Sequence, residues 1–284
     1  MVGLSGAAML SVAITIGIFF SLLVPAIRFF REVPIGDFLF GTRWAPTFAD
    51  ADFGVLPLIT GTLWTTAIGL AIAVPFGLGA AVYLSEYAHE RVRRILKPVL
   101  EVLAGIPSVV YGYFALYFVA PQLLNGVLGI EVGTFSVLAA GLVLGVMIIP
   151  TVASLSEDAM SAVPQALRQG SMALGANKMR TTLRVVFPAA ISGITAAIVL
   201  ALSRAVGETM IVALAAGTRA QIVTTPTGNG QTMTGFIAQT ATGESTPGTL
   251  TYNTLFAVGL LLFLLTLAFN LFAGVIVRRV REVY

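Results

Sequence analysis

The chain has 284 residues, of which 57% are hydrophobic and 10% are charged, with a mean hydropathy of +0.94 and a net charge of +3. A soluble domain carries about a quarter charged residues, so this composition excludes an ordinary soluble enzyme. The chain has no cysteine, which excludes disulfides and thiol chemistry. Its basic residues lie in short segments between apolar stretches, a pattern that does not indicate a nucleic-acid partner.

Six apolar stretches are each long enough to cross a bilayer as an α-helix. A hydrocarbon core of roughly 30 Å requires about 20 apolar residues, and unbroken apolar runs favour helices over the alternating strands of a barrel. We therefore predict one all-α integral membrane domain that occupies the whole chain, 1–284. Its expected transmembrane helices are 7–27, 55–83, 96–119, 135–153, 189–216 and 252–277. Pro75 and Pro107 lie inside the second and third of these, where proline predicts a kink.

The distribution of basic residues predicts how these helices are oriented. The segments on one side of the membrane contain four Arg or Lys residues, and those on the other side contain eleven. The first set comprises 28–54, 120–134 and 217–251, and the second comprises 84–97, 154–187 and the C-terminal tail. Because positive charge accumulates on the cytoplasmic side, we expect both termini in the cytoplasm. Residues 1–6 contain no Lys or Arg, which favours a first membrane helix over the alternative of a cleaved signal peptide.

Two charged residues, Arg204 and Glu208, lie within the fifth predicted helix. A charge at the bilayer centre costs about 2.5–3.5 kcal/mol on insertion scales, and the i,i+4 spacing would place both residues on one helix face. One interpretation is a self-neutralising pair that holds helices together. The other, which we favour, is a pair that lines a substrate pathway, in which the Arg meets an anionic solute and the Glu tunes it. A guanidinium suits an oxyanion such as phosphate or sulfate, because it donates two parallel hydrogen bonds.

Two shorter patterns concern helix packing. Gly141 and Gly145 form a G-x-x-x-G motif in the fourth predicted helix, which predicts a close approach of another helix. Lys97 and Glu101 are four residues apart near the cytoplasmic end of the third predicted helix, which predicts an ion pair on one helix face.

The segment 154–187 is long, basic and partly apolar, which predicts a helical elbow on the cytoplasmic side. Such an elbow is suited to docking into a groove of a partner, and the equal alternative is that it lies on the inner leaflet. Gly170 and Gly175 have the glycine spacing of a P-loop, but Ala176 stands where lysine is required. If this chain drives active transport, the energy therefore comes from another subunit or from an ion gradient.

The elbow resembles the coupling loop of binding-protein-dependent ABC importer permeases, whose pattern is E-A-A-x3-G-x9-I-x-L-P. Gly175 and Pro188 match this pattern at the right spacing. Other positions depart from its commonest residues, namely Gln169, Gly170, Ser171, Val185 and Phe187. The resemblance implies a type I ABC importer permease fold and an ATPase-coupling role for five residues of the elbow. These residues are Arg168, Gln169, Gly170, Ser171 and Gly175.

Four further segments are similar to the phosphate-specific importer permeases. They are FGTRWAP at 40–46, YLSEY at 83–87, LAGIPSVVYG at 103–112 and RAVGETM at 204–210. The last of these, together with the stretch 252–279, resembles the PstC type of subunit more than the PstA type. In that family the Arg and Glu that match Arg204 and Glu208 are associated with transport competence.

The resemblance to the phosphate-specific permeases also implies partners and a location. A PstA-like permease would complete the pathway, two copies of a PstB-like ATPase would hydrolyse ATP, and a PstS-like binding protein would deliver phosphate. The assembly would lie in the plasma (inner) membrane of a bacterium or archaeon. The chain itself would bind no cofactor or metal and would catalyse no reaction.

Three alternatives stay open at this point. The first is a permease for another oxyanion, sulfate or molybdate. The second is a self-contained channel or gradient-driven transporter, which the docking-type elbow and the lack of an internal repeat disfavour. The third is a scaffold that reports phosphate status to a cytoplasmic kinase, a role that no feature of the sequence tests.

Overall fold

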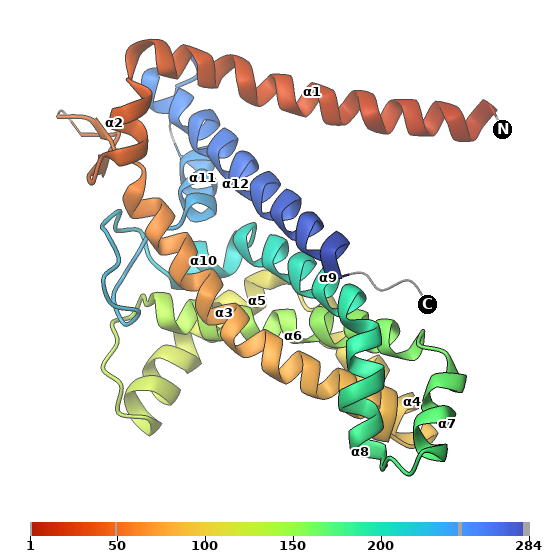
Figure 1. Cartoon of the computed structure of the whole chain (residues 1–284). Coiled ribbons are helices and arrows are strands. Elements are labelled where there is room, and N and C mark those ends of the chain that lie inside the picture. Colours follow the sequence, from red (N-terminus) through yellow and green to blue (C-terminus); the bar gives the residue numbers. More distant parts are fainter. Residues whose placement is uncertain (1, 49, 244–245, 281–284) are drawn as a thin grey trace.

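The computed structural model describes residues 2–48, 50–243 and 246–280, so Arg281 of the basic tail lies outside the described residues. The described residues form long helices flanked by shorter ones (Figure 1). The long helices are α1 Val2–Glu32, α3 Leu56–Val82, α4 Glu90–Gly105, α6 Val137–Ser161, α9 Phe187–Val206 and α12 Leu250–Val280. The short α-helices are α2 Ile35–Phe40, α5 Ser108–Phe114, α7 Gln165–Ala173, α8 Lys178–Thr181, α10 Met210–Ala215 and α11 Met233–Thr242. Three π-helical segments are η1 Tyr83–Tyr87, η2 Ala115–Val127 and η3 Thr182–Val186, and strands β1 Trp44–Ala45 and β2 Asp52–Phe53 pair antiparallel.

Among the described residues, five helices are long and apolar enough to cross a membrane. They are Ser5–Glu32, Leu56–Tyr87, Val137–Ser161, Lys178–Val206 and Leu250–Val275. A sixth candidate is a bent pair, Glu90–Gly105 with Ser108–Val127. The all-α membrane fold predicted from the apolar runs is thereby confirmed.

The third apolar stretch differs from the single kinked helix expected over 96–119. Helix α4 ends at Gly105, α5 begins at Ser108, and the two axes meet at 85°. Pro107 has no backbone N–H to continue α4, and it holds Ile106 in the extended conformation (φ −66°, ψ 129°). This stretch is therefore a sharp corner.

The most extensive helix contact joins α3 to α6, and glycine allows the close approach. A Cβ on Gly145 would lie 2.8 Å from the carbonyl oxygen of Gly69 and 2.9 Å from Cβ of Ile72. A Cβ on Gly141 would lie 2.8 Å from Cβ of Ile68. The close packing predicted from the G-x-x-x-G motif is confirmed, and its partner is a helix of the same chain.

Gly145→Ala is expected to lower the thermal unfolding midpoint of the purified protein. The added methyl group meets backbone and a β-branched side chain, and overpacking of this kind costs about 1–3 kcal/mol. Gly79→Ala is the matched control, because a Cβ at Gly79 of α3 has nothing within 4 Å and alanine favours a helix over glycine. Equal midpoints for the two variants in the same detergent would contradict the packing argument.

The N-terminal part of helix α1 extends away from the other helices, and α1 packs against α12 (Figure 1). The rings of Phe19 and Phe263 join the two helices with centroids 5.8 Å apart. Most other apolar side chains of α1 are exposed, including Met9 at 73%. An apolar surface of this size is expected to face lipid or another membrane subunit.

Helix α3 runs between two opposite ends of the molecule (Figure 1). Beside its N-terminus lie α2, α11 and the segment 216–232, and beside its C-terminus lie η1, α7 and α8. The segment between membrane helices expected over 154–187 is shorter than predicted, because α6 continues to Ser161 and the next candidate membrane helix begins at Lys178. We call residues 162–186, which include α7, α8 and η3, the elbow.

Candidate functional site

The fifth predicted helix is interrupted just after Arg204. Helix α9 ends at Val206, and α10 begins at Met210. The expectation of one continuous helix over 189–216, with Arg204 and Glu208 on the same face, is therefore wrong. Among the described residues, no ion pair joins these two side chains.

Glu208 is held by the backbone that follows it. Its Oε1 accepts hydrogen bonds from the backbone N–H groups of Met210 (3.0 Å) and Ile211 (3.3 Å). Its carbonyl oxygen accepts a hydrogen bond from Thr234 Oγ1 at 2.6 Å. The Glu208 carboxylate thereby satisfies N–H groups at the start of α10 that have no partner within that helix. Because these N–H groups bind the side chain, they do not bond to carbonyls of α9, and α9 does not continue.

Arg204 lies in the last turn of α9, and its side chain is exposed on the surface of the single chain. In the described parts of the chain its guanidinium has no carboxylate partner. The C-terminal turn of a helix favours a cation, but an unpaired charge within a membrane-crossing helix usually faces a cavity or another polar group. The arrangement thus leaves Arg204 available to an anion or to a second subunit.

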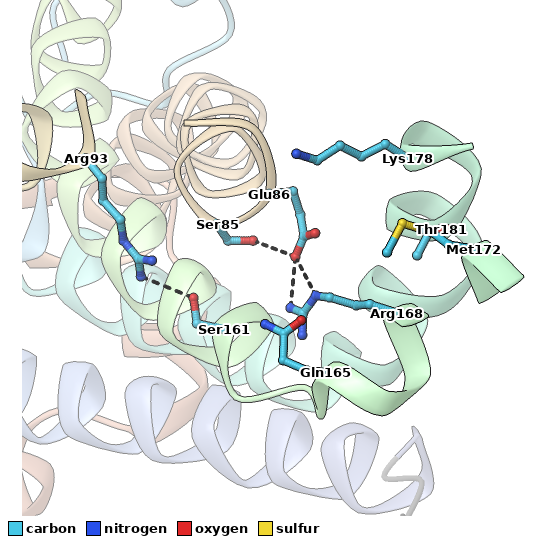
Figure 2. A pocket seen from close by; sticks show the side chains of 9 residues that line it. All are labelled: Ser85, Glu86, Arg93, Ser161, Gln165, Arg168, Met172, Lys178 and Thr181. Atoms are coloured by element: carbon cyan, nitrogen blue, oxygen red, sulfur yellow. Dashed lines mark hydrogen bonds and ion pairs between the residues drawn. The ribbon is translucent and has the colours of Figure 1, made fainter. Parts of the chain in front are cut away.

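The elbow is attached to the other helices through Arg168 (Figure 2). Its guanidinium Nη2 and Nε donate to Glu86 Oε1 at 2.9 and 3.3 Å. The same guanidinium donates to the carbonyl of Met160 at 2.8 Å and to the carbonyl of Val163. Arg168 thereby joins α7 to η1 and to the C-terminal end of α6.

This ion pair is buried, with side-chain exposures of 9% for Arg168 and 8% for Glu86. A buried ion pair stabilises only when its hydrogen-bonding groups are satisfied, and removal of one partner from such a pair costs about 3–5 kcal/mol. Glu86 could not be predicted as the partner of Arg168 from local patterns, because the two residues are 82 positions apart. Its place within the YLSEY segment was the one signal that could have pointed to it.

The other predicted coupling residues have different environments. Gln169 and Gly170 are exposed, whereas Ser171 Oγ lies 3.0 Å from Thr181 Oγ1 and ties α7 to α8. Gly175 has φ +84°, a conformation that favours glycine, and it turns the chain after α7. Gln169 and Gly170 are therefore free to contact a partner, whereas Ser171 and Gly175 shape the elbow.

The tip of the elbow carries exposed apolar side chains. Leu174 is 91% exposed and Met179 is 64% exposed. Met172 and Leu183 are exposed as well. A cluster of exposed apolar residues beside polar ones is typical of an interaction surface, and Gln169 and Gly170 precede Met172 on α7.

A second charged cluster joins α4 to α6. Lys97 Nζ lies 2.7 Å from Glu157 Oε2 and 3.2 Å from Asp158 Oδ1, and Arg93 also pairs with Glu157. Glu157 is 1% exposed. The ion pair expected between Lys97 and Glu101 is absent from the described residues, because the lysine turns toward α6 instead. Glu157 could not be predicted as the partner of Lys97 from local patterns, because the two residues are 60 positions apart.

A cavity of about 410 Å³ lies between these two clusters (Figure 2). Arg93, Arg168 and Glu86 line it, and each of them is already paired. Lys178 lies 5.2 Å from the ring centroid of Tyr87, a cation–π distance. We interpret this cavity as part of the joint between the elbow and the membrane helices. No group of His, Asp or Glu within the described ranges is placed to hold a metal ion.

Comparison with known proteins shows to which family the chain belongs. Residues 73–282 match the family described as "Binding-protein-dependent transport system inner membrane component". The chain is 38% identical over 236 residues to the probable ABC transporter permease protein YqgH of Bacillus subtilis, an alignment that covers 83% of this chain and 75% of the relative. It is also 38% identical over 251 residues to the phosphate transport system permease protein PstC 1 of Mycobacterium tuberculosis, with 81% and 74% covered.

A solved structure of the MetNI methionine ABC transporter, in an inward-facing conformation, has a similar fold. The TM-score is 0.58 at 21% sequence identity, and the match covers 81% of this chain and 95% of that chain. At this identity the likeness concerns the fold alone. With the family match over most of its length, the chain belongs to the inner membrane components of binding-protein-dependent transport systems.

Proposed function

We propose that this chain is a permease subunit of an ATP-driven phosphate importer and forms half of the substrate pathway. The observation that carries the proposal is Arg204, an exposed guanidinium without a carboxylate partner in the described chain, beside a break in a membrane-crossing helix. Relatives at 38% identity are named as an ABC transporter permease and as a phosphate transport permease. A PstA-like permease would supply the other half of the pathway and cover the exposed side of Arg204.

The elbow is the proposed contact with the ATPase. Its exposed apolar tip around Leu174, together with Gln169 and Gly170, would dock on one of two copies of a PstB-like subunit. The Arg168–Glu86 pair would transmit movement of the docked elbow to α3, because it joins α7 to the segment that continues α3. ATP would be bound and hydrolysed by the partner, and this chain would bind no cofactor of its own.

The proposed orientation follows from the basic residues. The elbow and both termini would lie in the cytoplasm, and the opposite end, with α2, α11 and segment 216–232, would face a PstS-like binding protein outside. In this orientation all six apolar stretches would cross the membrane, and the bent pair of α4 with α5 and η2 would be the third crossing. The membrane would be the plasma (inner) membrane of a bacterium or archaeon.

Uptake of radiolabelled phosphate into proteoliposomes tests the proposal directly. We expect uptake to require internal ATP, the ATPase and the external binding protein, and to be inhibited by excess unlabelled phosphate but not by sulfate or molybdate. Stronger inhibition by sulfate or molybdate than by phosphate would assign the permease to that oxyanion. Phosphate uptake by this chain without the ATPase would contradict the ATP-driven mechanism.

A further inference from the structure

A second polar cavity lies at the end of the molecule opposite the elbow. Its volume is about 620 Å³, and strand β1 and the segment 218–221 contribute to its wall together with α11. Two arginines, Arg43 and Arg219, line it from separate parts of the chain. Gln221 and Gln231 add amide groups, and Trp44 and Phe236 add aromatic rings.

The charge of this cavity is unbalanced. Both arginine side chains are exposed, and neither takes part in an ion pair within 2–48, 50–243 and 246–280. The described residues that line the cavity include no Asp or Glu. The cavity beside the elbow differs in this respect, because Glu86 lines it and neutralises Arg168. Two guanidinium groups in one concave site attract an anion with several acceptor oxygens.

The backbone that carries the two arginines is held in place. The N–H of Arg219 donates to Asn229 Oδ1 at 3.3 Å, and its carbonyl accepts from the backbone N–H of Gln231 at 2.9 Å. The carbonyl of Arg43 accepts from the N–H of Gly54 at 2.9 Å. Anchored backbones keep both arginines at the wall of one cavity, which lowers the entropic cost of binding an anion there.

Two aromatic rings form a rigid part of the cavity wall. Trp44 is 5% exposed, and its indole Nε1 has no hydrogen-bond partner among the described residues. Its ring packs edge-on against Phe236 at a centroid distance of 4.9 Å. The indole N–H is itself closed off from solvent, so the two rings give the cavity a fixed aromatic wall and leave the binding of an anion to the arginines.

A neighbouring trough continues the polar surface. Its volume is about 540 Å³, and it shares Thr47 and Thr240 with the arginine cavity. Threonine hydroxyls and the amide of Gln239 line it, and none of its described lining residues is acidic. The Thr249 and Thr251 hydroxyls already donate to the carbonyls of Thr246 and Pro46, so the trough extends the polar surface, whereas the positive charge stays in the arginine cavity.

Helix α11 connects this cavity to the pathway arginine. Phe236 lines the cavity, and Thr234, two residues earlier, donates to the carbonyl of Glu208. Glu208 in turn caps α10, which follows the break after Arg204. Contacts through α11 and Glu208 therefore link the cavity to the helix break that follows Arg204.

We propose that the cavity lined by Arg43 and Arg219 is an entry site that binds a free tetrahedral oxyanion before it reaches Arg204. The identification of this oxyanion as inorganic phosphate rests on the proposed function, whereas the existence of the site does not. In the assembled importer, the site would receive phosphate released from the binding protein.

Protection of arginine from phenylglyoxal tests the site without transport. The probe is inorganic phosphate, added to the detergent-purified complex without binding protein or ATP, and modification is measured by mass spectrometry. At phosphate about ten times its dissociation constant, modification of Arg43 and Arg219 is expected to slow about tenfold, because only unoccupied sites react. Arg28 and Arg31, exposed residues that precede α2 and do not line the cavity, are the matched controls.

Unchanged modification of Arg43 and Arg219 in phosphate would overturn the site. Protection by phosphatidylglycerol micelles but not by inorganic phosphate would overturn its assignment to a free anion. If the arginines are protected but the complete importer shows no ATP-driven phosphate uptake, the site stands and the proposed function fails.

Equilibrium binding of radiolabelled phosphate separates this site from the pathway arginine. In an Arg204→Gln background, the complex is expected to keep one phosphate site. Adding Arg43→Gln and Arg219→Gln is expected to weaken that binding at least about tenfold for each arginine removed, because charge-assisted hydrogen bonds are lost. Equal binding by the single and triple variants would contradict the proposal, and the protection experiment on the unmodified complex stays decisive if the triple variant does not assemble.

Discussion

Arg204→Gln is expected to abolish ATP-driven phosphate uptake while the complex remains assembled. The substitution removes the guanidinium proposed to meet the anion within the membrane, and the loss of a charged bidentate interaction predicts a rate at least about a hundredfold lower. Assembly is expected to survive, because Arg204 has no ion-pair partner in the described chain and Glu208 is already held by Met210 and Ile211. Initial uptake rates and subunit co-purification measure the two effects.

Arg204→Lys is the informative companion to this variant. Lysine keeps the positive charge but lacks the planar fork that matches two oxygens of an oxyanion. We therefore expect partial uptake, between the unmodified protein and Arg204→Gln. Normal uptake by Arg204→Gln would remove this residue from the substrate pathway and would leave stabilisation of the end of α9 as its role.

Arg168→Met is expected to loosen the elbow and to weaken its action on the ATPase. It leaves the Glu86 carboxylate buried without its cation, and it removes the guanidinium from the carbonyls of Met160 and Val163. Loss of one partner from a buried pair costs about 3–5 kcal/mol, and we expect this cost to weaken the packing of α7 against η1 and α6. The elbow should then exchange amide hydrogens faster, and stimulation of ATPase activity by the permease should fall.

Arg94→Met is the matched control for this experiment. Arg94 pairs with Glu90 at 3.1 Å on α4, but the two side chains are 76% and 86% exposed, so the pair contributes little to stability. The same chemical change is therefore expected to leave hydrogen exchange of the elbow unaltered. Faster exchange in both variants, or in neither, would contradict the assignment of a mechanical role to the Arg168–Glu86 pair.

Much of the fold could be read from the order of residues, because the relevant physics is local along the chain. Runs of about 20 apolar residues satisfy the length of a membrane crossing. Four of the six predicted stretches are matched by single candidate membrane helices, whereas the third is bent and the fifth ends at Val206. The spacing of Gly141 and Gly145 predicted a close helix contact, which α3 supplies. The match of Gly175 and Pro188 to a known pattern indicated the family.

Other features depend on residues that are distant in sequence, so local patterns could not predict them. Arg168 was expected at a docking surface, but its partner Glu86 draws it into a buried joint. Lys97 was expected to pair along its own helix, but Glu157 lies closer in space.

The membrane class, the family and the residue types of the candidate sites follow from contiguous residues, because hydrophobicity and motif spacing are local properties. The roles of Arg204 and Glu208 depend instead on folding, since α9 ends between the two residues and the Glu208 carboxylate accepts hydrogen bonds from the backbone of α10. Folding also brought Arg43 and Arg219, 176 positions apart in the numbering, to one cavity. Such contacts depend on packing between helices, which no short segment of the chain contains.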